Sequence, residues 1–287
     1  MTTAAAYYFG PRSAPLFGYL HAPARARERS GVKSGVLVCP PMGHEYMAAH
    51  RTVRQTAVRL ARAGVPTLRF DFFGAGDSAG DSSEGCPSRW LVDIGIAAGE
   101  LSTRLASSRA KRPVPSRVEG PAPSDAQGLD LGGVEGNVSI VGLRLGAALA
   151  LLHLQRPEAA DARNLVLWDP VVRGRAYVDE LMALQRARFG RANGDEVLGF
   201  PFTATLRSEL EAIDLTRIER PRAREVLIVD TGAAPDETRA LVDRLRGVGV
   251  PVEHRSLAAR PFWHEPNKSA VAAEVVQAIV AWTSTRC

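Results

Sequence analysis

A regular alternation of short apolar runs and helical patterns constrains the fold of this chain more than any other feature of its sequence. Each apolar run is short enough for one strand, and apolar residues recur at helical spacing in the segments between and after the runs. The predicted strands are residues 36–39, 65–70, 137–141, 165–168, 225–229 and 250–257, and the predicted helices are residues 48–63, 90–105, 147–154, 236–247 and 269–283. Strands that alternate with helices predict an α/β fold with a mostly parallel central sheet and helices on both faces.

The length of 287 residues, with 45% apolar and 23% charged residues, predicts a single globular domain over residues 1–287. Residues 7–9 and 17–20 predict an antiparallel hairpin at one edge of the sheet. Residues 107–135 are rich in Pro, Gly, Ser and charge, which predicts a flexible insertion. Residues 170–221 have a helical pattern between the fourth and fifth strands, where a helical cap over an active site is expected.

The charge and cysteine content argue against several classes of function. The formal net charge is +5, but the arginines are spread along the chain and mixed with acids, which argues against nucleic-acid binding. No apolar run reaches the roughly 18 residues of a membrane span, and no signal peptide is visible. The three cysteines, Cys39, Cys86 and Cys287, form no CxxC pair, which suits the reducing cytoplasm. The six histidines show no metal-ligand spacing, so neither a metal nor a cofactor is expected.

The segments that follow the predicted strands are the candidate site, because functional residues gather at the carboxyl ends of parallel strands. After the first strand come Gly43 and His44, where backbone N–H groups can approach an anionic oxygen as in an oxyanion hole. A tight turn from strand to helix explains the same glycine equally well. After the second strand come Gly74, Gly76 and Gly80, whose spacing does not match a phosphate-binding loop, so no nucleotide is predicted.

The most informative segment is Gly142-Leu-Arg-Leu-Gly146, between the third strand and an Ala-rich helix. A strand, a G-x-X-x-G turn and a helix are typical of the nucleophile elbow of α/β hydrolases. The sharp turn requires the glycines, and the middle residue projects into the active site. That residue is Ser, Cys or Asp in an active hydrolase, and here it is Arg144. The backbone N–H of Leu145 joins those of Gly43 and His44 as an expected oxyanion donor.

Two later segments supply a candidate acid and a candidate histidine. Asp230 ends the fifth strand and Asp236 begins the next helix, while His264 follows the sixth strand. The order of elbow, acid and histidine matches the triad of the same fold. Asp236 is the preferred acid because Asp230 can be used in forming the turn. Taken singly, Asp236 can simply cap its helix and His264 can be a surface residue, but their joint placement favours a site.

These segments together resemble the α/β-hydrolase superfamily on its serine aminopeptidase-like side, and more closely the bacterial exosortase A system-associated hydrolase 2 proteins. The resemblance spans most of the chain outside residues 107–135 and rests on residues 39–45, 68–78, 141–147 and 165–171. It implies an α/β-hydrolase fold with a helical cap and a bacterial hydrolase activity, and Arg144 is typical of this subgroup. Related proteins are encoded beside polyketide and peptide biosynthesis genes, so the resemblance also implies that setting.

Three functions fit an arginine at the elbow, which stays protonated at neutral pH and so cannot accept an acyl group. In the first, His264, oriented by Asp236 or Asp230, is a general base, and Arg144 holds a carboxylate, phosphate or developing oxyanion. In the second, the nucleophile is displaced to Cys39, or to Ser78 or Cys86 after the second strand. A buried apolar role is the simpler interpretation of Cys39, and a turn-forming role is the simpler interpretation of Ser78. In the third, a pseudo-hydrolase binds an acyl, peptide or carrier-protein partner, and Arg144 pairs with Asp236 or Glu265.

The substrate that these hypotheses share is a small-molecule or carrier-bound acyl ester, thioester or amide. The oligomeric state stays open, with a homodimer among the alternatives.

Overall fold

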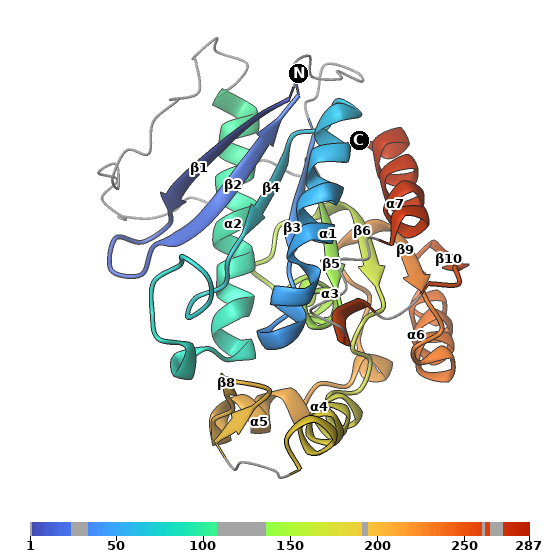
Figure 1. The fold of residues 1–287 in the computed structure, drawn as a ribbon. Coiled ribbons are helices and arrows are strands. Elements are labelled where there is room, and N and C mark those ends of the chain that lie inside the picture. Colours follow the sequence, from blue (N-terminus) through green and yellow to red (C-terminus); the bar gives the residue numbers. More distant parts are fainter. Residues whose placement is uncertain (1, 24–33, 108–135, 191–194, 260–261, 265–271) are drawn as a thin grey trace.

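The architecture is an eight-stranded sheet with helices on both faces (Figure 1). The computed structural model describes residues 2–23, 34–107, 136–190, 195–259, 262–264 and 272–287, and it describes only the backbone of His264. The strands are β1 (Thr3–Phe9), β2 (Leu16–Ala22), β3 (Gly35–Cys39), β4 (Thr67–Phe70), β5 (Val138–Leu143), β6 (Ala162–Trp168), β9 (Ala223–Asp230) and β10 (Val252–Ser256). The predicted α/β fold is confirmed. Of the predicted insertion at residues 107–135, all but Ser107 lies outside the described residues.

The strand order is β1-β2-β4-β3-β5-β6-β9-β10. The pairs β1–β2 and β2–β4 are antiparallel, which confirms the predicted edge hairpin, and the remaining pairs are parallel. Cys39 pairs with Gly142, and Leu143 pairs with Trp168, so β3, β5 and β6 end side by side. The residues that follow these strands therefore meet at one edge of the sheet.

Two apolar layers follow from the alternation of side chains along the strands. Helices α1 (Gly43–Arg62) and α7 (Ala273–Arg286) pack on one face, which includes Val141. Helices α2 (Pro87–Ser107), α3 (Leu145–His153) and α6 (Pro235–Gly247) pack on the other, which includes Ile140. None of the helices that the structure describes is both long and apolar enough to cross a bilayer.

Helix α1 begins at Gly43, earlier than the predicted start at residue 48. The physical reason is that His44 and Glu45, in its first turn, are buried although they are polar. Apolar periodicity therefore does not mark the first turn as part of an amphipathic helix. Because this turn belongs to a helix, its side chains have fixed directions at the carboxyl edge of the sheet.

The connection between β6 and β9 lies beyond the carboxyl ends of the strands (Figure 1). It contains α4 (Gly174–Phe189), β7 (Glu196–Val197), β8 (Phe200–Pro201), α5 (Ala204–Glu211) and the 3-10 helix η3 (Leu215–Arg217). The helical pattern of residues 170–221 is thus interrupted by a short antiparallel hairpin, β7–β8. A Cβ at Gly174 would lie 1.6 Å from the carbonyl oxygen of Leu210, so glycine is required where α4 meets the end of α5. The role of this connection as a cap stays a prediction.

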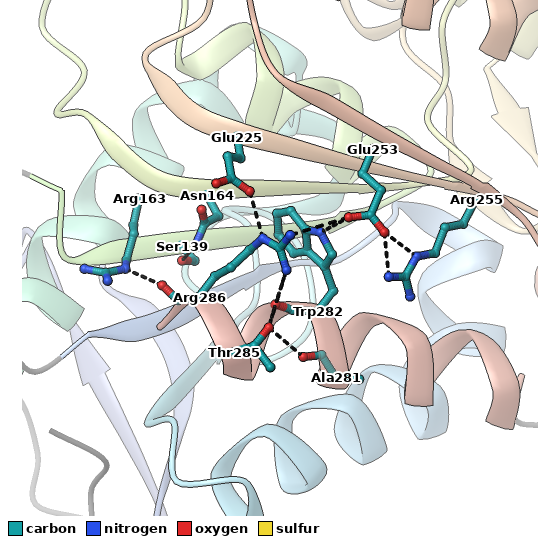
Figure 2. A network of polar contacts seen from close by, with 10 residues as sticks. All are labelled: Ser139, Arg163, Asn164, Glu225, Glu253, Arg255, Ala281, Trp282, Thr285 and Arg286. Atoms are coloured by element: carbon teal, nitrogen blue, oxygen red, sulfur yellow. Dashed lines mark hydrogen bonds and ion pairs between the residues drawn. The ribbon is translucent and has the colours of Figure 1, made fainter. Parts of the chain in front are cut away.

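A polar network at the amino ends of the strands, opposite the candidate site, holds α7 in place (Figure 2). Arg286 Nε lies 2.7 Å from Glu225 Oε2, and Trp282 Nε1 donates to Glu253 Oε2 over 2.7 Å. Glu225 and Glu253 lie near the amino ends of β9 and β10, away from the candidate site. The ion pairs are partly exposed, so each contributes at most about 1 kcal/mol, and we assign the network a structural role.

Candidate active site

The turn between β5 and α3 has the backbone geometry of a nucleophile elbow. Arg144 has φ 53° and ψ −121°, a left-handed φ that a residue with a side chain adopts at a cost of about 1–3 kcal/mol. Its N–H donates to the carbonyl of Trp168 over 2.9 Å, and its own carbonyl accepts from the N–H of Ala147 over 3.0 Å. The neighbouring strand and the helix together hold the strained residue in place.

Both glycines of the elbow are required by close backbone approaches. A Cβ at Gly142 would lie 2.4 Å from the Cα of Ala147. A Cβ at Gly146 would lie 2.3 Å from the carbonyl oxygen of Pro40 and 2.4 Å from that of Cys39. Real Cβ contacts are never so short, so α3 can pack against the ends of β3 and β5 only if both positions are glycine.

The Arg144 side chain is held between two carboxylates. Its Nε lies 2.9 Å from Glu45 Oε1, and its terminal nitrogen Nη2 lies 2.7 Å from Glu180 Oε2. The Tyr177 hydroxyl donates to the other oxygen of Glu45 over 2.9 Å. The guanidinium carbon also lies 5.1 Å from the ring centroid of Trp263 and 5.4 Å from that of Tyr177. Arg144 itself is 4% exposed, so this cation is buried together with Glu45 and Tyr177.

Burial and charge act in opposite directions on this cluster. Burial raises the pKa of Glu45, and the charge of Arg144 opposes that rise. Burial alone would lower the pKa of Arg144, but the charges of Glu45 and Glu180 outweigh it and leave that pKa above its ordinary value. Burial, followed by the charge of Glu45, raises the pKa of Tyr177 well above its ordinary value. Arg144 therefore stays protonated and Tyr177 stays neutral.

Two buried aspartates follow the neighbouring strands β6 and β9. Asp169 has φ 41° and accepts from the Thr231 N–H over 2.8 Å and from its hydroxyl over 2.9 Å. Burial raises the pKa of Asp169 to about 6. Asp230 Oδ2 lies 2.5 Å from His254 Nε2, and Asp230 Oδ1 accepts from the Ser256 hydroxyl over 3.1 Å. Asp230 thus orients a histidine that sequence reasoning did not single out.

The preferred acid, Asp236, lies at the surface. It is in the first turn of α6, its side chain is 91% exposed, and it pairs with Arg239 at 3.2 Å. This position suits an acid that stabilises the start of its own helix and argues against a triad role. His264 ends the 3-10 helix η4 (Phe262–His264), but its side chain lies outside the described residues, as does Glu265.

Two of the alternative nucleophiles, Cys39 and Ser78, are also poorly placed. Cys39 is fully buried, and burial raises the pKa of its thiol, so the reactive thiolate is disfavoured. Ser78 donates to the carbonyl of Asp71 over 2.6 Å and accepts from the Phe17 N–H over 2.8 Å, so its hydroxyl holds a turn.

The predicted oxyanion donors lie around the elbow. Gly43 and His44 begin α1, and Leu145, which is 1% exposed, begins α3. A Cβ at Gly43 would lie 3.6 Å from the Phe200 ring, so the β7–β8 hairpin covers the start of α1. Their oxyanion role stays a prediction. Within the described residues, no three His, Cys, Asp or Glu side chains gather as a metal site would require.

Sequence reasoning missed the partners of Arg144. The pseudo-hydrolase hypothesis paired it with Asp236 or Glu265, whereas the structure pairs it with Glu45 and Glu180. Glu45 did offer a signal, because it directly follows Gly43 and His44 after the first strand. Glu180 offered none, since it is one of many charged residues in a helical segment.

No protein-family model and no curated protein sequence matches this chain. Several solved structures do. Est1E from Butyrivibrio proteoclasticus, with ferulic acid bound, is 16% identical, with a TM-score of 0.61 over 97% of this chain and 98% of that one. A hyperthermophilic esterase from the archaeon Pyrobaculum calidifontis is 17% identical, with a TM-score of 0.60 over 99% of this chain and 85% of that one. The carboxylesterase Cest-2923 from Lactobacillus plantarum is 12% identical, with a TM-score of 0.61 over 99% of this chain and 98% of that one.

At these identities the similarity establishes the fold alone. The sheet order and the strained turn at Arg144 agree with it. The chain therefore has the α/β-hydrolase fold.

Proposed function

We propose that this chain is a pseudo-hydrolase, an α/β-hydrolase-fold protein that binds an acyl compound without forming an acyl-enzyme. The observation that carries the proposal is the pairing of Arg144 with Glu45 at 2.9 Å and Glu180 at 2.7 Å. A guanidinium has no free electron pair for attack on a carbonyl at neutral pH, and this one is further stabilised in its charged form. The elbow position therefore carries a fixed cation in place of a nucleophile.

The other residues that a hydrolase needs support the same proposal. The Cys39 thiol is buried and protonated, and the Ser78 hydroxyl is used in a turn. Asp236 projects into solvent. An acyl-enzyme would need Cys39 or Ser78 as nucleophile, or Asp236 as the acid of a triad, and the surroundings of each side chain oppose that role.

The ligand class is taken from the structural neighbours. One has ferulic acid bound and two are named as esterases or carboxylesterases. We extend to this chain only the class, a free or carrier-bound acyl compound. The resemblance to exosortase A system-associated proteins would place such a ligand in bacterial polyketide or peptide biosynthesis, in the cytoplasm.

A second candidate is a hydrolase in which a histidine activates water directly. Its supporting observation is the buried Asp230, which follows the strand where this fold places its acid and contacts His254 at 2.5 Å. The hypothesis drawn from the sequence uses His264 and Asp236 instead. In either form Arg144 would stabilise the developing oxyanion.

A turnover assay separates the candidates. Wild type, Arg144→Ser, Cys39→Ala, His264→Ala and His254→Ala are each given p-nitrophenyl butyrate and a butyryl thioester. We expect wild-type rates equal to the protein-free control, with methyl ferulate or ferulic acid raising the melting temperature. Wild-type turnover that is lost in either histidine variant but kept in Cys39→Ala would replace the pseudo-hydrolase with the second candidate. An acyl adduct detected by mass spectrometry would also refute the proposal.

A further inference from the structure

The two counter-ions of Arg144 differ in burial. The Glu45 side chain is 1% exposed, and its two oxygens accept from Arg144 and Tyr177. The Glu180 side chain is 35% exposed and contacts Arg144 Nη2 at 2.7 Å. Glu45 is thus a permanent partner of the guanidinium, whereas Glu180 borders solvent.

These two carboxylates also belong to different parts of the fold. Glu45 lies in the first turn of α1, which packs directly on the sheet. Glu180 lies on α4, in the connection that covers the carboxyl edge, one helical turn after Tyr177. If the half of α4 that carries Tyr177 and Glu180 moves away, Arg144 keeps Glu45 and loses Glu180, and Glu45 loses its hydrogen bond from Tyr177.

From this asymmetry we infer that Arg144 Nη2 is the recognition point for a ligand carboxylate, and that Glu180 is the intramolecular stand-in for that carboxylate. The inference rests on the proposed function and names its ligand class, a carboxylic acid with an apolar body. Phe200, whose ring lies 3.6 Å from a Cβ built at Gly43, supplies an apolar surface at the same edge.

The balance of charge explains why an anionic ligand is favoured. Arg144 loses a counter-charge when Glu180 leaves, and a ligand carboxylate restores that charge at the buried guanidinium. A neutral ester of the same shape restores none, so the acid is favoured over the ester.

The test compares an acid with its ester in matched variants. Ferulate and methyl ferulate are titrated by calorimetry into wild type, Glu180→Gln, Glu180→Asp and Asp179→Asn. Asp179 is an exposed neighbour on the same helix, so its variant controls for the change in net charge. If the Glu180–Arg144 contact is formed in about nine molecules of ten, the apparent affinity of wild type for ferulate is about tenfold lower than that of a variant without the contact. We therefore expect Glu180→Gln to bind ferulate about tenfold more tightly than wild type.

The remaining variants and a second measurement complete the test. Glu180→Asp should bind ferulate with intermediate affinity, and Asp179→Asn should match wild type. Methyl ferulate should bind equally to every variant. In wild type, ferulate should also increase hydrogen exchange of α4 amides over Gly174–Phe189. If Glu180→Gln does not fold, the comparison of ferulate affinity between Glu180→Asp and wild type replaces it.

The outcomes distinguish the two proposals. Failure of the acid and the ester to bind any folded variant would sink the proposed function. Binding of both compounds with equal affinity in wild type and Glu180→Gln, with unchanged exchange in α4, would leave the pseudo-hydrolase standing and overturn the role of Glu180.

Discussion

Removing one carboxylate at a time should show how differently Glu45 and Glu180 support the same arginine. Glu45→Gln keeps the shape of the side chain but leaves Arg144, which is 4% exposed, without its buried counter-ion. Breaking a buried ion pair by removing one partner costs about 3–5 kcal/mol. Glu180→Gln removes a partner whose side chain is 35% exposed, and water replaces much of that interaction, so about 1 kcal/mol or less is expected.

Equilibrium urea unfolding followed by circular dichroism measures both losses, with Asp179→Asn as the control for charge. The double variant Glu45→Gln/Arg144→Met should regain most of the stability lost in Glu45→Gln, because no unpaired charge then stays buried. Equal losses for Glu45→Gln and Glu180→Gln, or no recovery in the double variant, would refute the assignment of Glu45 as the structural partner.

Three further predictions concern the elbow, the buried acid and the thiols. Gly146→Ala should lower the free energy of unfolding in urea by about 2–3 kcal/mol, because its Cβ would lie 2.3 Å from a backbone oxygen. The control Gly247→Ala, whose Cβ meets nothing within 4 Å, should lose none. Equal losses would contradict the packing argument. Burial raises the folded pKa of Asp169 from 3.8 to about 6, so between these pH values the folded state binds a proton that the unfolded state has lost. The free energy of unfolding should therefore fall by about 3 kcal/mol as the pH rises from about 4 to 6. Asp169→Asn should flatten that part of the profile, and a slope unchanged from wild type would exclude Asp169 as its source. Among the thiols, Cys86 should react with Ellman's reagent in the native protein while the buried Cys39 reacts only in urea, and rapid native labelling of Cys39 would revive it as a nucleophile.

The sheet, its helices and the elbow were predictable because their signals are local. Apolar runs and helical spacing depend on neighbouring residues, and Gly142 and Gly146 flank Arg144 within one short turn. The start of α1 was predicted too late because His44 and Glu45 are buried polar residues, which periodicity interprets as exposed. A short hairpin, β7–β8, likewise escaped prediction inside a segment with helical character.

The candidate acid could not be settled from its neighbours. Asp230 and Asp236 both follow the fifth strand, and either can reach the carboxyl edge of a sheet. The choice depends on the direction in which α6 begins, which places the Asp236 side chain in solvent at 91% exposure. The contact between Asp230 and His254 escaped prediction because His254 lies within a strand. Functional residues are expected in the segments that follow strands.

The sequence predicted the α/β-hydrolase fold, which the structure confirms, and it predicted that Arg144 stands where a nucleophile would be. It could not determine what the arginine faces. Its partners, Glu45 and Glu180, are separated from it by 99 and 36 residues and come from different parts of the fold. Helices and turns are set by contacts between near neighbours. A buried charge is compensated by whichever carboxylates the packing brings to it, so the pairing of Arg144 could be seen only in the folded chain.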